Sequence, residues 1–207
     1  MRLNFFMVLI LVSSTVSASD SLSFTKTEMV YGRKDGMALT MTVLKPIKNT
    51  NGKAIVSVLS GNWVSSERMR QNFPERAQLY IDAGYTVFGV MVGCQPRYTI
   101  PDEIIDLKRA VRFIRFNAKE YGIDANKIGI TGSSSGGHLS LMIATANETE
   151  NSKSNDPVDK VSSRVQAVAV FYGAAGFIKF AFIASKANKL FFFFFRILAN
   201  IKTAIIA

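Results

Sequence analysis

Apolar and polar positions alternate along the chain in patterns that are typical of strands. Residues 37–46 follow a period of two after a turn, so residues 23–46 are predicted to form an antiparallel hairpin that ends at Pro46. Continuous apolar runs at residues 53–60 and 86–92 are typical of strands buried on both faces of a sheet. Residues 165–173 predict a further strand.

The clearest helical pattern covers residues 100–124. Apolar residues recur there at helical spacing and form one face, at Ile104, Leu107, Val111, Ile114 and Ala118. Asp102 and Glu103 fall in the first turn, and Gly122 ends the helix. The arginines and lysines face away from the apolar stripe, so we expect them to form a solvated surface and not a binding site.

Residues 65–85 also predict helical structure, interrupted or restarted at Pro74. Strands and helices therefore alternate, which predicts an α/β fold with a mostly parallel sheet covered by helices on both faces. At 207 residues, with 48% apolar and 19% charged residues, the chain can bury one sizeable core, so one domain is expected.

The first 18 residues have the pattern of a secretory signal. Arg2 precedes an apolar run at residues 5–12, and small residues follow up to Ala18, after which cleavage is expected. The alternative is an uncleaved anchor, but the apolar run is short for a membrane span. We therefore expect a secreted or periplasmic protein whose domain covers residues 19–176.

The net charge of +10 is concentrated in the C-terminal tail, residues 177–207, which carries five basic and no acidic residues. Residues 19–176 hold 19 of the 25 basic residues and all 15 acidic ones, an ordinary balance for a globular domain. No motif for reading grooves or stacking RNA bases accompanies the excess, so no nucleic-acid partner is expected. Cys94 is the only cysteine, and we expect a small buried apolar side chain in preference to a reactive thiol.

Ser134 lies in the pattern Gly132-x-Ser134-x-Gly136, between the short apolar run at residues 128–130 and a segment with helical spacing. In this pattern the serine sits on a strained strand-to-helix turn that exposes its hydroxyl, so Ser134 is the candidate catalytic nucleophile. The alternatives are a loop rich in glycine and serine, or a phosphate cradle. The cradle is disfavoured because no Gly-Lys-Ser/Thr follows.

Three stretches carry a resemblance to a known family: "GSSSGGHLSL", "DLKRAVRFIRFNAKEYGIDANKIGITG" and "VSVLSGNWVSS". Across about residues 24–173 the chain resembles the α/β-hydrolase fold, in particular the secreted esterase and lipase group that includes carbohydrate acetyl and feruloyl esterases. The resemblance implies a serine ester hydrolase that acts on a small-molecule or carbohydrate ester and needs no cofactor or metal. A peptidase or a long-chain lipase is the alternative within the class.

The resemblance also implies an oxyanion hole made of backbone amides. The family's HGGxW-like stretch corresponds to Ser60, Gly61, Asn62 and Trp63, so Asn62 or Gly61 is expected to supply one amide and Ser135 the other. Trp63 is expected either to line the acyl pocket or to be an aromatic residue at the edge of the core. Tyr98 and Arg97 follow a predicted strand at its carboxyl end, and they are further candidates for the substrate pocket.

The catalytic acid and histidine are not found. His138 is the only histidine, and it lies one helical turn after Ser134, so we expect it to pack beside the helix. The resemblance implies the same, because the similar family histidine is structural and not catalytic. No Asp or Glu follows Asp159, and Asp156 and Asp159 are expected to be loop residues. We therefore expect a fold truncated before its last strands, and an inactive chain.

The tail has no Gly, Pro, Asp or Glu and holds half of the 16 phenylalanines, so it lacks residues that make turns. A truncated or frame-shifted coding sequence would explain such a segment. The alternative is a non-catalytic, esterase-like binding protein whose basic tail lies on an anionic membrane surface.

Overall fold

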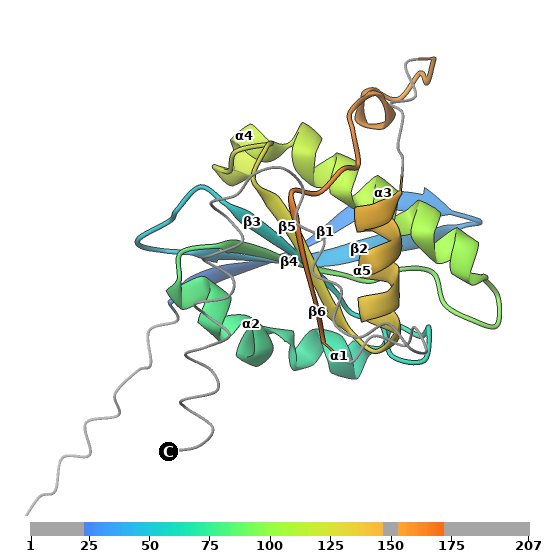
Figure 1. Ribbon diagram of the computed structural model, residues 1–207, viewed down its shortest axis with the longest axis horizontal. Helices are drawn as coiled ribbons and strands as arrows, with labels where there is room; N and C mark the ends of the chain where they lie inside the picture. Colours follow the sequence, from blue (N-terminus) through green and yellow to red (C-terminus); the bar gives the residue numbers. More distant parts are fainter. Residues whose placement is uncertain (1–22, 147–152, 172–207) are drawn as a thin grey trace, which may run out of the picture.

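The computed structural model describes residues 23–146 and 153–171 (Figure 1). These residues form a six-stranded sheet in the order β1-β2-β4-β3-β5-β6. The predicted signal at residues 1–18 and the predicted tail at residues 177–207 lie outside the described residues, so export and membrane contact stay predictions. Within the described residues, no helix combines the length and the apolar composition that a membrane span requires.

One edge of the sheet is the predicted hairpin. Strands β1 (Phe24–Lys34) and β2 (Met37–Pro46) pair antiparallel around Asp35 and Gly36. Both turn residues have positive φ, 47° and 77°, as a two-residue turn of this hand requires. The hairpin joins the rest of the sheet through an antiparallel pairing of β2 with β4.

The other four strands are parallel, as predicted. Strand β4 (Thr86–Val90) pairs with β3 (Ala54–Val58), β3 with β5 (Ile128–Ser133), and β5 with β6 (Ala167–Phe171). All five residues of β4 are buried, because helices cover both of its faces. Parallel strands end at the same edge of a sheet, so the segments that follow β3, β4 and β5 meet there.

The helices form two layers, with α1 and α2 along one side of the sheet and α3 and α5 along the other (Figure 1). Helix α1 (Glu67–Gln71) and helix α2 (Phe73–Asp82) flank the predicted break, with Pro74 in the first turn of α2. Phe73, Ala77 and Ile81 pack on one face of the sheet against Ile55 and Val87.

Helix α3 (Ile100–Phe116) continues into the short α4 (Ala118–Tyr121), which Gly122 ends in a left-handed conformation at φ 70°. Leu107, Val111 and Ile114 of α3 pack with Leu139 of α5 (Ser135–Thr145) on the second face of the sheet. The predicted apolar face of this helix is confirmed, with Ile104 partly buried at its edge.

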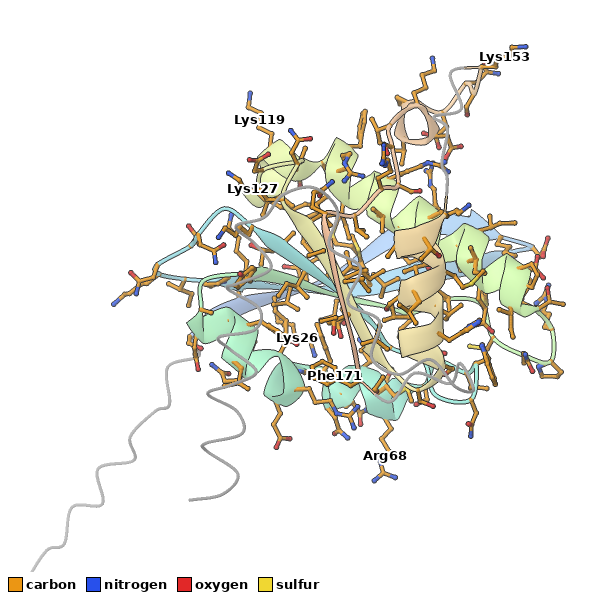
Figure 2. The ribbon with its side chains drawn as sticks, viewed as in Figure 1. Lys26, Arg68, Lys119, Lys127, Lys153 and Phe171 are labelled. Atoms are coloured by element: carbon orange, nitrogen blue, oxygen red, sulfur yellow. The ribbon has the colours of Figure 1, made fainter. Side chains whose placement is uncertain are left out.

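The predicted solvated surface on α3 is wrong for three of its arginines. Arg109 pairs with Asp156 at 2.7 Å and with Asp159 at 2.8 Å. Asp156 directly precedes the 3-10 helix η1 (Pro157–Lys160), and Asp159 lies within it. Arg112 and Arg115 donate to backbone carbonyls of the segment that leads from η1 to β6. Lys119 on α4, in contrast, points away from the protein (Figure 2). The cationic face therefore attaches the loop before β6 to the domain.

Candidate active site

Ser134 occupies a sharp corner between β5 and α5, as the sequence predicts. Its φ of 53° and ψ of −124° are rare for a residue with a side chain, and they mark a strained turn. Its N–H donates to the Phe171 carbonyl at 3.1 Å, and its carbonyl accepts from the His138 N–H at 3.0 Å. These bonds hold the backbone, while the Ser134 side chain is exposed at the edge where the parallel strands end.

The two glycines of the motif are required by close backbone approach. A Cβ atom at Gly132 would lie 2.5 Å from the Gly136 carbonyl carbon and oxygen. A Cβ at Gly136 would lie 2.7 Å from the Val58 carbonyl oxygen. The corner is therefore packed against the end of β3, and only glycine fits at these two positions without displacing backbone.

The turn that follows β3 lies against the start of α5. Gly61 and Val64 exchange two backbone hydrogen bonds of 3.0 Å around Asn62 and Trp63, whose φ angles are 50° and 57°. Ser60 precedes this turn, and its Oγ lies 3.2 Å from the Oγ of Ser135. The stretch resembling an oxyanion loop is thus joined directly to the residue after Ser134.

The hydrogen bonds distinguish between the two amides proposed for this loop. The Gly61 N–H donates to Val64 and is therefore occupied. Asn62 is exposed and lies at a central position of the turn, where the amide takes no part in the pairing of Gly61 with Val64. The Ser135 N–H is the first of α5, and the first amides of a helix have no acceptor within the helix.

His138 is directed at Trp63. The two rings meet edge to face, with centroids 6.1 Å apart and an interplanar angle of 77°. The Nδ1 atom of His138 and the Nε1 atom of Trp63 are both buried without a hydrogen-bond partner in the described part of the chain. Trp63 is half-buried, and the contact joins the turn after β3 to the first turn of α5.

The structure places Arg97 and Tyr98 beside the β1–β2 hairpin. Arg97 is exposed and donates to the Asp35 carbonyl at 3.1 Å. Tyr98 is buried under Lys34, whose Nζ lies 4.2 Å from the ring centroid. These contacts attach the segment after β4 to the hairpin, and none of them joins either residue to Ser134.

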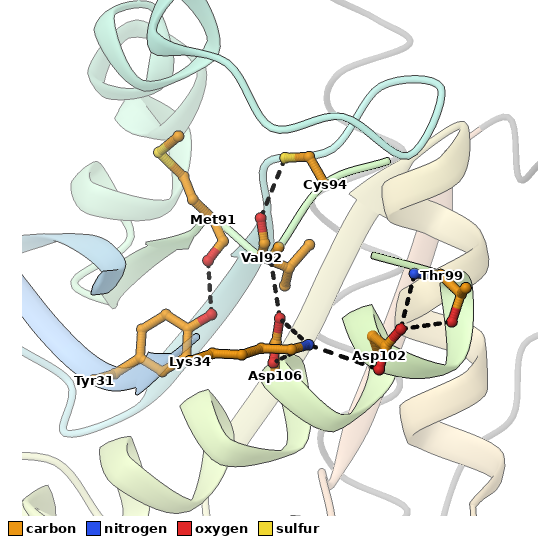
Figure 3. A network of polar contacts seen from close by, with 9 residues as sticks. Tyr31, Lys34, Met91, Val92, Cys94, Thr99, Asp102 and Asp106 are labelled. Carbon is orange, nitrogen blue, oxygen red and sulfur yellow. Dashed lines mark hydrogen bonds and ion pairs between the residues drawn. The ribbon is translucent and has the colours of Figure 1, made fainter. Parts of the chain in front are cut away.

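Sequence reasoning missed a buried polar network at the start of α3 (Figure 3). Asp106 accepts from the Gly93 N–H at 3.0 Å and pairs with Lys34 at 3.1 Å. Tyr31 Oη donates to the Met91 carbonyl at 2.6 Å. The available signal was spacing, because Asp106 falls on the same helix face as the buried Leu107 and Ala110.

Glu103 lies on that face too, and its side chain is fully buried. Neither of its carboxylate oxygens has a hydrogen-bond partner among the described residues. Burial, and then the negative charge of Asp106, raise the pKa of Glu103 to about 7. In the part of the chain that the structure describes, no group of three or more side chains is arranged to hold a metal ion.

The family is shown by comparison with known proteins. The model of the BD-FAE family matches residues 41–190, more than half of the chain. The chain belongs to the BD-FAE family. The resemblance to esterases predicted from the sequence is thereby confirmed.

The relatives of this BD-FAE chain are esterases. A probable carboxylic ester hydrolase, LipM of Mycobacterium tuberculosis, is 33% identical over 72% of this chain and 34% of that protein. An acetylxylan esterase of Xylanibacter ruminicola is 30% identical over 69% of this chain and 28% of that protein. The chain spans about a third of the length of the curated relatives it matches.

The fold agrees with solved esterase structures. Thermogutta terrifontis esterase 2 aligns with a TM-score of 0.62 at 24% identity, over 72% of this chain and 56% of that one. An acetyl ester-xyloside bifunctional hydrolase of Caldicellulosiruptor lactoaceticus aligns with a TM-score of 0.63 at 22% identity, over 71% and 57%. The predicted α/β-hydrolase fold is confirmed.

Proposed function

We propose that this chain carries the nucleophile and the oxyanion-binding part of a serine ester hydrolase site. The observation that carries the proposal is the corner at Ser134, where a strained backbone exposes a serine side chain above the end of β5. Strain of this kind persists only where the surrounding structure enforces it, and here two glycines make the close packing possible. The esterase relatives support the same class of reaction.

In this reaction the Ser134 Oγ attacks the carbonyl carbon of an ester. A bond forms between Oγ and carbon, the carbonyl electron pair moves to oxygen, and a base must take the hydroxyl proton. The carbon–oxygen bond of the ester then breaks, the leaving oxygen takes the proton from the base and departs as an alcohol, and an acyl-serine remains. Water hydrolyses the acyl-serine to the carboxylic acid and frees the Ser134 hydroxyl. The first step places negative charge on the former carbonyl oxygen, so fixed donors aimed at that oxygen lower the barrier.

The proposed donors are the backbone amides of Ser135 and Asn62. The first belongs to the N-terminus of α5, where the helix dipole adds to the stabilisation of negative charge. The second belongs to the turn joined to Ser135 through Ser60. Each such donor contributes about 3 kcal/mol to transition-state stabilisation in acyl-transfer enzymes. Gly61 is left out of the proposal because its amide is occupied.

His138 is not proposed as the base. Its ring faces Trp63, and the carbonyl of Ser134 binds its backbone N–H as part of the helix. We propose instead that His138 and Trp63 position the turn that carries Asn62, and that Trp63 borders the acyl side of the site. Asp156 and Asp159 are engaged by Arg109 and are not proposed as the acid.

The proposed substrate is a small-molecule or carbohydrate ester. The acetylxylan esterase among the curated relatives and the acetyl ester-xyloside hydrolase among the solved structures support this class. Neither the reaction nor the residues involved require a cofactor.

Organophosphate labelling tests the nucleophile, since one solved structure in the comparison is esterase 2 phosphorylated by paraoxon. The chain is incubated with excess paraoxon, and the phosphorylated peptide is mapped by mass spectrometry. We expect label on Ser134 that Ser134→Ala abolishes. Ser133→Ala is the matched control, because Ser133 is the adjacent serine and is also exposed. Equal labelling of Ser133 and Ser134 would refute the proposal.

A further inference from the structure

The turn at Asn62 and Trp63 is strained and needs contacts from outside to persist. Asn tolerates a positive φ, but a bulky aromatic residue at φ 57° is a clear outlier. Left-handed backbone at a non-glycine residue costs on the order of 1–3 kcal/mol. The bonds between Gly61 and Val64 close the turn but do not attach it to the rest of the molecule.

Besides the contacts of Ser60 and Trp63 with α5, an attachment comes from the segment after β4. The Ser65 N–H donates to Cys94 Sγ at 3.0 Å, and the Cys94 S–H lies within reach of the Val92 carbonyl at 3.3 Å and the Ser65 carbonyl at 3.6 Å. The Val92 N–H donates to Ser65 Oγ at 3.2 Å. The Gln95 N–H donates to the Trp63 carbonyl at 3.3 Å. Cys94 is thus half-buried and hydrogen-bonded, and the prediction of a simple buried apolar side chain is wrong.

The segment that leads to Cys94 is itself fixed at two points, Met91 and Gly93 (Figure 3). Asp106, paired with Lys34, holds the Gly93 N–H, and Tyr31 holds the Met91 carbonyl. The network is rooted in α3 and β1, which are large elements of the domain. Cys94 therefore connects a rigid part of the protein to the strained turn.

We propose that Cys94 is a positioning residue for the oxyanion turn: its thiol holds Ser65 and so keeps the turn that carries Asn62 in place against the start of α5. The role of the Asn62 amide rests on the proposed function, whereas the tether itself is a property of the fold. The test therefore measures the conformation of the turn and not hydrolysis, so that it can fail or succeed independently of the esterase proposal.

Amide hydrogen exchange of residues 61–65 reports opening of the turn in the full chain. We expect Cys94→Ala to raise exchange of these amides roughly fivefold, the effect of losing about one hydrogen bond. Cys94→Ser keeps a donor and an acceptor and should restore slow exchange. Asn51→Ala is the matched control. The Asn51 side chain also bonds two backbone groups, but it lies before the amino end of β3, so this variant should leave the exchange of residues 61–65 unchanged.

Trp63 is the only tryptophan, so its fluorescence gives a second measurement on the wild-type chain. Methyl methanethiosulfonate converts the Cys94 thiol to a methyl disulfide and releases methanesulfinate, and dithiothreitol reverses the change. We expect quenching of Trp63 by acrylamide to rise after modification and to return after reduction, with unchanged far-ultraviolet circular dichroism.

Three outcomes would overturn the tether. Amide exchange of residues 61–65 could stay the same in Cys94→Ala, and quenching of Trp63 could stay the same after modification of the thiol. Exchange of residues 61–65 could be as fast in Cys94→Ser as in Cys94→Ala. Exchange could rise equally in β3 and β5, which would indicate general destabilisation and not positioning.

Discussion

At the scale of single residues, the corner at Ser134 combines strain with very close packing. The Ser134 backbone is held by bonds to Phe171 and His138, and Gly136 lies directly on the carbonyl of Val58. Val58 belongs to β3, a strand paired on both sides, so this carbonyl cannot easily move. The geometry of the nucleophile therefore depends on glycines that carry no chemistry of their own.

Gly136→Ala is expected to destabilise the protein. Its new Cβ would lie 2.7 Å from the Val58 oxygen, and overpacking of this kind costs about 1–3 kcal/mol, which exceeds the gain of about 1 kcal/mol in helix propensity. Gly129→Ala is the control, because a Cβ there meets its nearest atom at an ordinary 3.7 Å. Urea unfolding measures both, and equal stability of the two variants would contradict the packing argument.

Glu103 predicts a pH dependence of stability. Its pKa is about 7 in the folded protein against 4.5 as the ordinary value, so between these values the folded state binds more protons than the unfolded state. Stability contributed by the neutral carboxyl is fully present below about pH 4.5 and is lost progressively as pH rises from there to about 7. The loss amounts to roughly 3 kcal/mol at most.

Glu103→Gln should remove this loss, because glutamine stays neutral. We expect the variant to exceed wild type in unfolding free energy at about pH 8 and to match it more closely at about pH 5. Glu120→Gln, at an exposed glutamate of α4, controls for the substitution. Denaturant titrations across this range provide the measurement. If the unfolding free energies of wild type and Glu103→Gln depend on pH in the same way, the raised pKa of Glu103 is ruled out.

At the scale of elements, α3 organises the domain through both of its faces. Its apolar face packs on the sheet, and its arginines hold the segment from Asp156 to Arg164 that leads into β6. Because the Ser134 N–H bonds to Phe171 at the end of β6, this attachment also supports the corner at Ser134.

Arg109→Met should release the loop before β6 while keeping the aliphatic packing of Arg109 against Gly32. The variant loses the ion pairs with Asp156 and Asp159, which are half-exposed and are expected to contribute about 1–2 kcal/mol. It also loses the hydrogen bond from the Arg109 guanidinium to the Tyr31 carbonyl. Limited proteolysis with cleavage sites mapped by mass spectrometry should show faster cutting within residues 153–164. Lys119→Met is the control, because Lys119 is exposed, and the protease should cut this variant within residues 153–164 at the wild-type rate.

At the scale of the whole molecule, the described residues include the proposed nucleophile corner and the proposed oxyanion turn, but not an acid and a base facing Ser134. Among these residues β6 has a partner strand on one side and β1 has one on one side, so both edges carry unpaired backbone groups. An edge of this kind favours association between chains wherever it is left uncovered.

Turnover by the chain is expected to be low. Loss of the base in a serine hydrolase costs about 10⁶ in kcat, and the oxyanion hole and binding alone leave a rate about 10³–10⁴ above water. We expect hydrolysis of 4-nitrophenyl acetate close to the uncatalysed rate. Slow labelling of Ser134 by paraoxon is compatible with this, because labelling needs one attack and not repeated turnover. The Ser134→Ala variant sets the background. Hydrolysis far above that background, lost in Ser134→Ala, would show that another group acts as the base.

The sequence by itself determined the features that depend on neighbouring residues. The strand, corner and helix around Ser134 lie within about twenty consecutive residues, and periodicity with a few glycines and prolines predicts them. The hairpin at Asp35 and Gly36 and the break at Pro74 are local in the same way.

Only the tertiary structure decided which polar groups meet. Ser60 and Ser135 are 75 residues apart, yet they are in contact because β3 pairs directly with β5. Lys34 and Asp106 are 72 residues apart, and they meet because α3 packs against β1. The pairing of β3 with β4 likewise brings Cys94 to Ser65, and the packing of α3 against η1 turns Arg109 towards Asp156. Periodicity reports which face of an element is buried, but the partner of each polar side chain depends on how the elements are arranged in space.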